Sequence, residues 1–132
     1  MSINAEKIVK DYLEAELNVW VGGSTPKNTN QSWVRITQLD DRNVAGQRTD
    51  HFNSHFLQID CYASGDGIEY QVEAGNLYRQ ARAALVAMPN ETISGVVVTA
   101  VTFGACPRIP DESFEPPRQR YIIDCFLYAH PA

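Results

Sequence analysis

The chain has 132 residues, 44% of them hydrophobic, which is enough for one domain that buries a core without disulfide or metal staples. Sixteen acidic and eleven basic residues give a formal net charge of -5 at pH 7, and this balance argues against a protein that binds nucleic acid or anionic membranes through bulk charge. Because the sequence has no apolar run of about 18 residues and no signal-peptide pattern at its N-terminus, we expect a protein that is made and kept in the cytoplasm.

The cysteines indicate free thiols rather than a disulfide framework. There are three of them, an odd number, and no two form a C-x-x-C pair. Cys61 and Cys125 fall on apolar faces of predicted strands, and Cys106 directly precedes Pro107. We therefore expect unpaired cysteines in a reducing compartment.

The first predicted element is a helix over residues 5–17. Asn4 stands at the expected N-cap position, since its side chain can accept a hydrogen bond from a backbone N–H of the first turn. Apolar residues recur at helical spacing along one side, and polar residues fill the other side. The apolar side consists of Ile8, Val9, Tyr12, Leu13 and Leu17.

Two strands and a long loop come next. Residues 19–21 form an apolar run that ends at a glycine pair, and residues 33–39 alternate, with Val34 and Ile36 on the apolar face. Residues 40–54 have almost no apolar content. Loops of this length in a small domain are usually functional or disordered, so we expect a flexible segment that can reach a neighbouring molecule.

The clearest strand and the clearest helix of the sequence stand side by side. Residues 55–63 alternate at the period of a half-buried strand, residues 64–67 predict a turn with Asp66 as helix N-cap, and residues 68–88 follow a helical period. The strand should place Leu57, Ile59, Cys61 and Ala63 on the core face and Phe56, Gln58, Asp60 and Tyr62 on the opposite face. The helix should turn Ile68, Val72, Gly75, Tyr78, Ala81, Leu85 and Met88 toward the core, together with Ala74, Leu77 and Ala84.

Two further strands complete the predicted fold. Residues 95–103 are β-branched and apolar on both faces, which is typical of an interior strand, and residues 119–129 alternate again after a proline-rich connector. The order α-β-β-β-α-β-β predicts an α+β fold, with a mainly antiparallel sheet and two helices packed on one face. We expect residues 1–132 to form a single domain.

A local repeat connects two of these strands. The segment Gln58-Ile59-Asp60-Cys61-Tyr62-Ala63 resembles Ile122-Ile123-Asp124-Cys125-Phe126, and each puts an acid and an aromatic ring on the face opposite the helices. Two interpretations remain open. The strands either share a burial pattern, or they form a sheet face that meets another subunit, where aromatic residues are enriched.

Residue types that carry chemistry are present but incompletely grouped. His51 and His55, with Asp50, Asp60 and Cys61 nearby, could supply metal ligands, but they fall in a loop and a strand entry rather than on one helix face. Cys106 lacks an identifiable base for nucleophilic catalysis. Gly65 and Gly67 precede a helix without the rest of a phosphate-binding motif. We predict no catalytic residue, no metal and no cofactor.

The order of elements resembles the tail terminator (tail completion) family of long-tailed bacteriophages. The resemblance rests on the N-terminal helix, the strand FLQIDCYA, the helix AGNLYRQARAALVAM, the strand VVVTAVTFGACPRIPD and the closing strand introduced by PPRQRYIIDCFLYA. It implies a virion protein, located in the tail or neck, that forms a ring, usually of six subunits, on the end of the tail tube. Such a ring stops tube growth and joins the head connector, and DNA passes through it without specific binding. The acidic balance suits that passage, since a conducting channel should not hold DNA.

The family implies partners rather than catalytic residues. The partners are further copies of the chain, the tail tube protein and the head–tail connector protein. The candidate contact residues are Arg42, Arg48 and Asp50 in the predicted loop, and Gln58, Asp60, Tyr62, Asp124 and Phe126 on the sheet. The alternatives are another phage neck or head–tail connector protein, or a small cytoplasmic α+β enzyme or ligand-binding domain.

Overall fold

The structure is a computed structural model that describes residues 3–39, 54–114 and 117–132, and six strands of these residues form one sheet. The strands are β1 (Trp20–Gly22), β2 (Trp33–Gln38), β3 (Ser54–Asp66), β4 (Thr92–Ile93), β5 (Val96–Phe103) and β6 (Arg118–Pro131). The helices are α1 (Ala5–Leu17), α2 (Gln71–Val86) and a short 3-10 turn, η2 (Ile68–Tyr70). The sheet order is β1-β2-β3-β6-β5-β4, and every pair is antiparallel except β1 and β2. The predicted α+β class is therefore confirmed.

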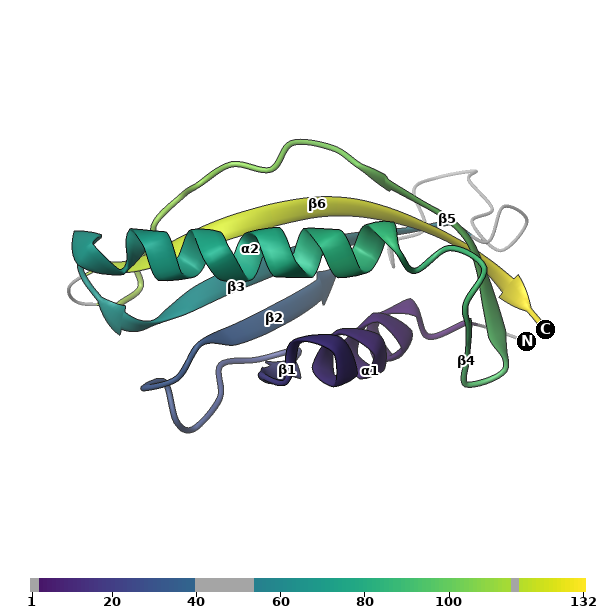
Figure 1. Cartoon of the computed structure of the whole chain (residues 1–132), viewed down its shortest axis with the longest axis horizontal. Coiled ribbons are helices and arrows are strands. Elements are labelled where there is room, and N and C mark those ends of the chain that lie inside the picture. The colour runs from purple at the N-terminus through teal and green to yellow at the C-terminus, as the bar shows by residue number, and fades with distance from the viewer. Residues whose placement is uncertain (1–2, 40–53, 115–116) are drawn as a thin grey trace.

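Both helices cover the same face of the sheet (Figure 1), as the sequence predicts. α2 packs on β3 and β6, the two longest strands, while α1 packs on β1 and β2. The core-face residues predicted for β3 are correctly assigned, because Leu57, Ile59, Cys61 and Ala63 are all fully buried. Burial of these side chains, together with those of the helices, supplies the main favourable term in folding.

The first helix has the predicted bounds and the predicted cap. The Asn4 side chain accepts a hydrogen bond of 3.1 Å from the Lys7 backbone N–H, which satisfies one of the free donors of the first turn. Ile8, Val9 and Leu13 are buried. The helix ends where Asn18 adopts a left-handed conformation with φ 55°, as Asn can at a helix C-terminus.

The second helix begins later than predicted, and the apolar residues at its start point toward solvent rather than toward the core. β3 continues through Asp66, Gly67 turns the chain at φ 97°, and η2 precedes α2, whose N-cap is Tyr70 rather than Asp66. The prediction that Ile68 and Val72 point toward the core is wrong, since they are 65% and 69% exposed.

Glu73 explains this orientation. Its carboxylate accepts hydrogen bonds from the Ser64 hydroxyl at 2.9 Å and the Ser32 hydroxyl at 3.1 Å, and also from the Ser64 backbone N–H. Because Glu73 is held against the strands, Val72 projects about 100° away around the helix and lies in solvent. Sequence periodicity predicts that an apolar valine points toward the core. It carries no information about the hydrogen bonds that hold the neighbouring Glu73 against the strands instead.

β5 is interior in the sheet order, as its apolar sequence indicates, but only Val96 and Val97 pair with a described strand on its outer side. Its outer neighbour β4 has two residues, so most of the outer edge of β5 pairs with no strand among the described residues. Beyond Phe103 the chain continues irregularly along β6, with Gly104 N–H donating to Asp124 at 2.8 Å and Asp111 N–H donating to Arg118 at 2.8 Å. Residues 104–111 thus extend the β5 side of the sheet.

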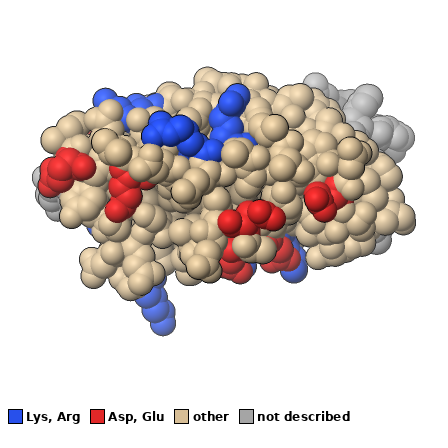
Figure 2. All heavy atoms as spheres, in the orientation of Figure 1, with Lys and Arg blue, Asp and Glu red and all other residues tan. Residues whose placement is uncertain are grey.

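The outer surface of the helix layer separates positive from negative charge. In Figure 2, Lys and Arg atoms lie mainly in the upper half of this face, and Asp and Glu atoms lie mainly in the lower half and toward the two ends. On α1 the charges pair within the helix, with Lys7 Nζ 2.7 Å from Asp11 and Lys10 Nζ 3.5 Å from Glu14. The arginines of α2 form no ion pair with a described residue.

We expect Leu57→Ala to cost about 2–5 kcal/mol of unfolding free energy, because it leaves a cavity beneath α2. Urea or thermal unfolding measures the loss. Thr37→Ala, which truncates an exposed side chain on the adjacent strand, should cost less than about 1 kcal/mol. A negligible shift for Leu57→Ala would mean that this residue is not in the core.

Candidate subunit interface

The sheet face opposite the helices carries polar and aromatic side chains in register. Residues paired directly across antiparallel strands project from the same face, so the strand register determines which of them meet. Across β2, β3 and β6, the register groups Trp33, Tyr62 and Arg120, then Arg35, Asp60 and Ile122, then Thr37, Gln58 and Asp124, and finally Phe56 with Phe126. This face divides into a buried half and an open half.

The buried half contains a polar network of Arg35, Asp60, Tyr62, Asp111 and Arg120. Asp60 is fully buried, and Arg35 Nη2 donates to its carboxylate at 3.1 Å and to the Tyr62 hydroxyl at 2.7 Å. The same Tyr62 hydroxyl donates to Asp111 at 2.7 Å. Arg120 Nη1 lies 4.0 Å from Asp60 and 3.9 Å from Asp111. Two carboxylates therefore face two guanidinium groups, as buried charges require.

Aromatic rings pack over this network. Trp33 and Tyr62, both fully buried, stack with ring centroids 3.8 Å apart and an interplanar angle of 4°. Phe114 approaches both rings, with centroids 6.3 Å from Trp33 and 6.1 Å from Tyr62. Arg118 lies over the Phe114 ring and donates to the Thr29 carbonyl. These contacts hold the segment around Phe114, which follows β5, over one end of the sheet.

The hydrogen bonds set the protonation states of the network. Burial acts to raise the pKa of Asp111, but hydrogen bonds from Tyr62 and Ser113 and the charge of Arg120 lower that pKa overall. Burial, and then the hydrogen bond to Asp111, raises the pKa of Tyr62. At neutral pH the tyrosine is therefore the proton donor and the aspartate is the charged acceptor.

The open half is formed by Phe56, Gln58, Asp124 and Phe126, which we call the aromatic patch. Phe56 and Phe126 stack with centroids 4.6 Å apart, and Phe126 is 36% exposed. Burial, and then the charge of Asp60, raises the pKa of Asp124, and this carboxylate forms no ion pair with any residue that the structure describes. An exposed aromatic ring such as that of Phe126 is enriched in surfaces that meet a protein partner.

The predicted contact residues on the sheet lie on this one face, but at different depths. Asp60 and Tyr62 are buried in the network, and Gln58 donates to Asp60 at 3.0 Å. Asp124 and Phe126 reach the surface of the patch. Three further candidates, Arg42, Arg48 and Asp50, lie outside the described residues.

Several residues of the face were not predicted as contact or network residues. Arg35 and Arg120 alternate with core residues on their strands. Their contacts with Asp60 on β3 could be predicted only with knowledge of how the three strands are aligned. Phe56 was assigned to this face but not to a contact. Asp111 sits in a proline-rich segment, where no periodicity exists that could have identified it.

The residues considered for metal or nucleophilic chemistry have other contacts. His55 Nδ1 lies 3.3 Å from the Gln38 amide, and His51 is outside the described residues. Within the described ranges, no group of three or more His, Cys, Asp or Glu could hold a metal ion, and no helix is long and apolar enough to cross a membrane.

All three cysteines are free thiols. Cys61 and Cys125 are buried, and burial raises the pKa of both, to about 12 for Cys125. The partly exposed Cys106 donates to the Gly104 carbonyl at 3.7 Å. None of these contacts supplies the base that a nucleophilic thiol would need.

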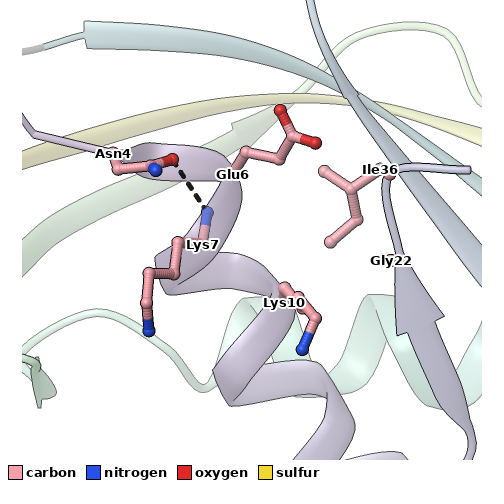
Figure 3. Close-up of a pocket in the computed structure, with 7 residues that line it drawn as sticks. Asn4, Glu6, Lys7, Lys10, Gly22 and Ile36 are labelled. Carbon is pink, nitrogen blue, oxygen red and sulfur yellow. Dashed lines mark hydrogen bonds between the residues drawn. The ribbon is translucent and has the colours of Figure 1, made fainter.

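A hollow of about 320 Å³ lies between α1 and the β1–β2 side of the sheet. In Figure 3, Glu6 extends from α1 toward Ile36, Lys10 lies between α1 and Gly22, and a dashed line marks the hydrogen bond between Asn4 and Lys7. Both lysines pair with carboxylates of α1, as described above. The hollow therefore contains no unpaired cation that would attract an anion.

Comparison with known proteins shows a likeness among solved structures. The chain matches no protein-family model and no curated protein. Among solved structures it is similar to a chain of the particle described as "Virion of native gene transfer agent (GTA) particle", with a TM-score of 0.61 and 15% sequence identity. The match covers 94% of this chain and 92% of that chain. At this identity, the likeness shows a shared fold over nearly the whole length.

We expect Asp60→Asn to lower the unfolding free energy by about 3 kcal/mol, because it removes the buried negative charge that faces Arg35 and Arg120. The matched control is Asp11→Asn, which removes an exposed partner of Lys7 and should cost less than about 1 kcal/mol although its N–O distance is shorter, 2.7 Å. Urea unfolding compares the two. A loss at Asp60 no larger than that at Asp11 would contradict a stabilising role for the network.

The lowered pKa of Asp111 predicts that the folded chain loses stability in acid. Its pKa in the folded chain is below the ordinary value of 3.8, so the folded state binds fewer protons than the unfolded state in that range. This stabilisation is fully present above about pH 4 and is lost as the pH falls through the folded-state pKa. The unfolding free energy of the wild type should therefore fall more steeply below about pH 4 than that of Asp111→Asn. Equal slopes in urea unfolding at several pH values would exclude this linkage.

Proposed function

We propose that this chain is a structural protein of a phage-like virion, and specifically a tail terminator that forms a ring on the end of the tail tube. The observation that carries the proposal is the shared fold with a chain of a gene transfer agent virion, which extends over 94% of the present chain. The order of elements in the sequence independently resembles the tail terminator family. On this proposal the protein acts by assembly and not by catalysis.

The aromatic patch supports this assembly role. Phe126 is one of the few large apolar side chains exposed on the sheet, and it stacks on Phe56 rather than standing alone. Clustered aromatic rings with a charged neighbour provide the contact area and the direction that a specific subunit contact needs. The rigid network beneath the adjacent half of the sheet would hold the patch in one shape, which lowers the entropy lost on association.

The charge of the chain fits a ring through which DNA passes. With a formal net charge of -5, the subunit repels a polyanion overall, so DNA can move through a ring of such subunits without being held. The tail tube protein and the head connector would then be the partners of the two ring faces.

Reconstitution with tail tube protein tests the proposal directly. We expect the purified chain to form closed rings, of the six subunits that the resemblance implies, in light scattering and electron microscopy. Added to polymerising tube protein, it should bind tube ends and produce tubes of limited length. Phe126→Ser should abolish both effects with a change in melting temperature of only a few degrees.

The matched control is Ile109→Ser, which removes another exposed apolar side chain, 47% exposed, outside the patch. It should form rings and stop tubes as the wild type does. Rings that do not bind tube ends but do bind a portal or connector would favour a different neck protein. A chain that stays monomeric at every concentration and on tube ends would overturn the proposal.

A further inference from the structure

The outward side of α2 is unusual for a surface helix, because it combines arginines with exposed aliphatic side chains. Arg79, Arg82, Ala83 and Val86 are all exposed, Val86 to 59%. Together with Tyr78 they line a shallow hollow of about 330 Å³. We call these four residues the α2 face.

The two arginines have no carboxylate partner among the described residues. Arg79 Nη2 donates to the Asn76 side chain at 2.7 Å, and the Arg82 guanidinium lies 4.6 Å above the Phe103 ring. By contrast, Lys7, Arg35 and Arg120 all lie within 4.0 Å of a carboxylate. Figure 2 shows basic atoms in the upper half of this side of the molecule. The chain has a net charge of -5, so these cations are suited to contact an acidic surface on a second copy of the same chain.

The aromatic patch offers the complementary chemistry on the other side of the sheet. It presents the carboxylate of Asp124, which pairs with no described cation, beside the exposed ring of Phe126. α2 and the patch lie on opposite faces of one sheet, so the two surfaces of one copy cannot meet each other. Two copies can bring them together.

We propose that the α2 face of one copy docks on the aromatic patch of the next copy, with Arg79 or Arg82 reaching Asp124 and Val86 packing on Phe126. This inference rests on the proposed function, because it identifies the contact that builds the ring. A contact between two different surfaces is head-to-tail, so each added copy leaves one free surface of each kind until the ring closes. Arginine beside exposed phenylalanine also permits stacking of the guanidinium on the ring.

Reversing the charges tests the pairing. Arg79→Asp/Arg82→Asp should remain folded and lose at least tenfold in apparent association constant by light scattering, since an acidic α2 face would meet Asp124. The control Lys7→Asp/Lys27→Asp makes the same change in net charge at exposed sites outside both surfaces and should associate like the wild type. Asp124→Arg should also fail alone, but mixed with Arg79→Asp/Arg82→Asp it should form rings in which the two variants alternate.

Cysteine cross-linking gives a readout that does not depend on how Asp124→Arg folds. On a Cys106→Ser background, chains with both Ala83→Cys on the α2 face and Thr102→Cys, at an exposed position paired with Phe126 across β5 and β6, should form a ladder of disulfide-linked oligomers that ends at the ring size. Chains with one of these substitutions should form no disulfide-linked species alone and only disulfide-linked dimers when mixed with the other. A single-cysteine chain that links to itself would indicate a two-fold contact and overturn the proposal.

The outcomes separate this inference from the function on which it rests. If the wild type forms rings and Arg79→Asp/Arg82→Asp forms them equally well, the α2 face is not the subunit contact and the inference fails while the proposed function stands. If that variant forms rings but no longer stops tube growth, the α2 face meets the tube instead, which also overturns the inference. If the wild type forms no ring under any condition, the proposed function itself fails.

Discussion

The buried carboxylate of Asp60 is the constraint on which the rest of the sheet depends. A fully buried charge is tolerated only with compensating partners, and here they come from both neighbouring strands, Arg35 on β2 and Arg120 on β6. A slip of one residue in either pairing would point an arginine into the apolar core and leave Asp60 uncompensated. The network therefore selects the register, and the same register places Phe56 against Phe126 and Gln58 against Asp124.

Alternation and helical spacing were sufficient to predict most of the fold, because burial repeats along regular elements. The two faces of β3, the bounds and cap of α1, and the placement of both helices on one side of the sheet all follow from such periods. The sheet half of the predicted interface was identified in the same way, since acids and aromatic rings occupied alternate positions on two strands.

The features of the fold and of the candidate interface that could not be predicted depend on contacts between residues far apart in the chain. The outward turn of Val72 follows from hydrogen bonds between Glu73 and two serines on the strand side, one of them 41 residues away. Asp111 joins the network through Tyr62, across 49 residues, from a segment with no period to read. The edge strand β4 pairs with only two residues of β5, and local composition does not encode the length of a neighbouring strand, so the shortness of this pairing could not be predicted from the apolar sequence of β5.

The free thiols have a consequence for how the interior of the chain responds to an oxidising environment. The sulfurs of Cys61 and Cys125 are enclosed by the core and remain protonated at neutral pH, so neither offers the thiolate that oxidants attack. The packing around these two sulfurs is therefore protected from oxidation, and a change of redox environment leaves this part of the core intact.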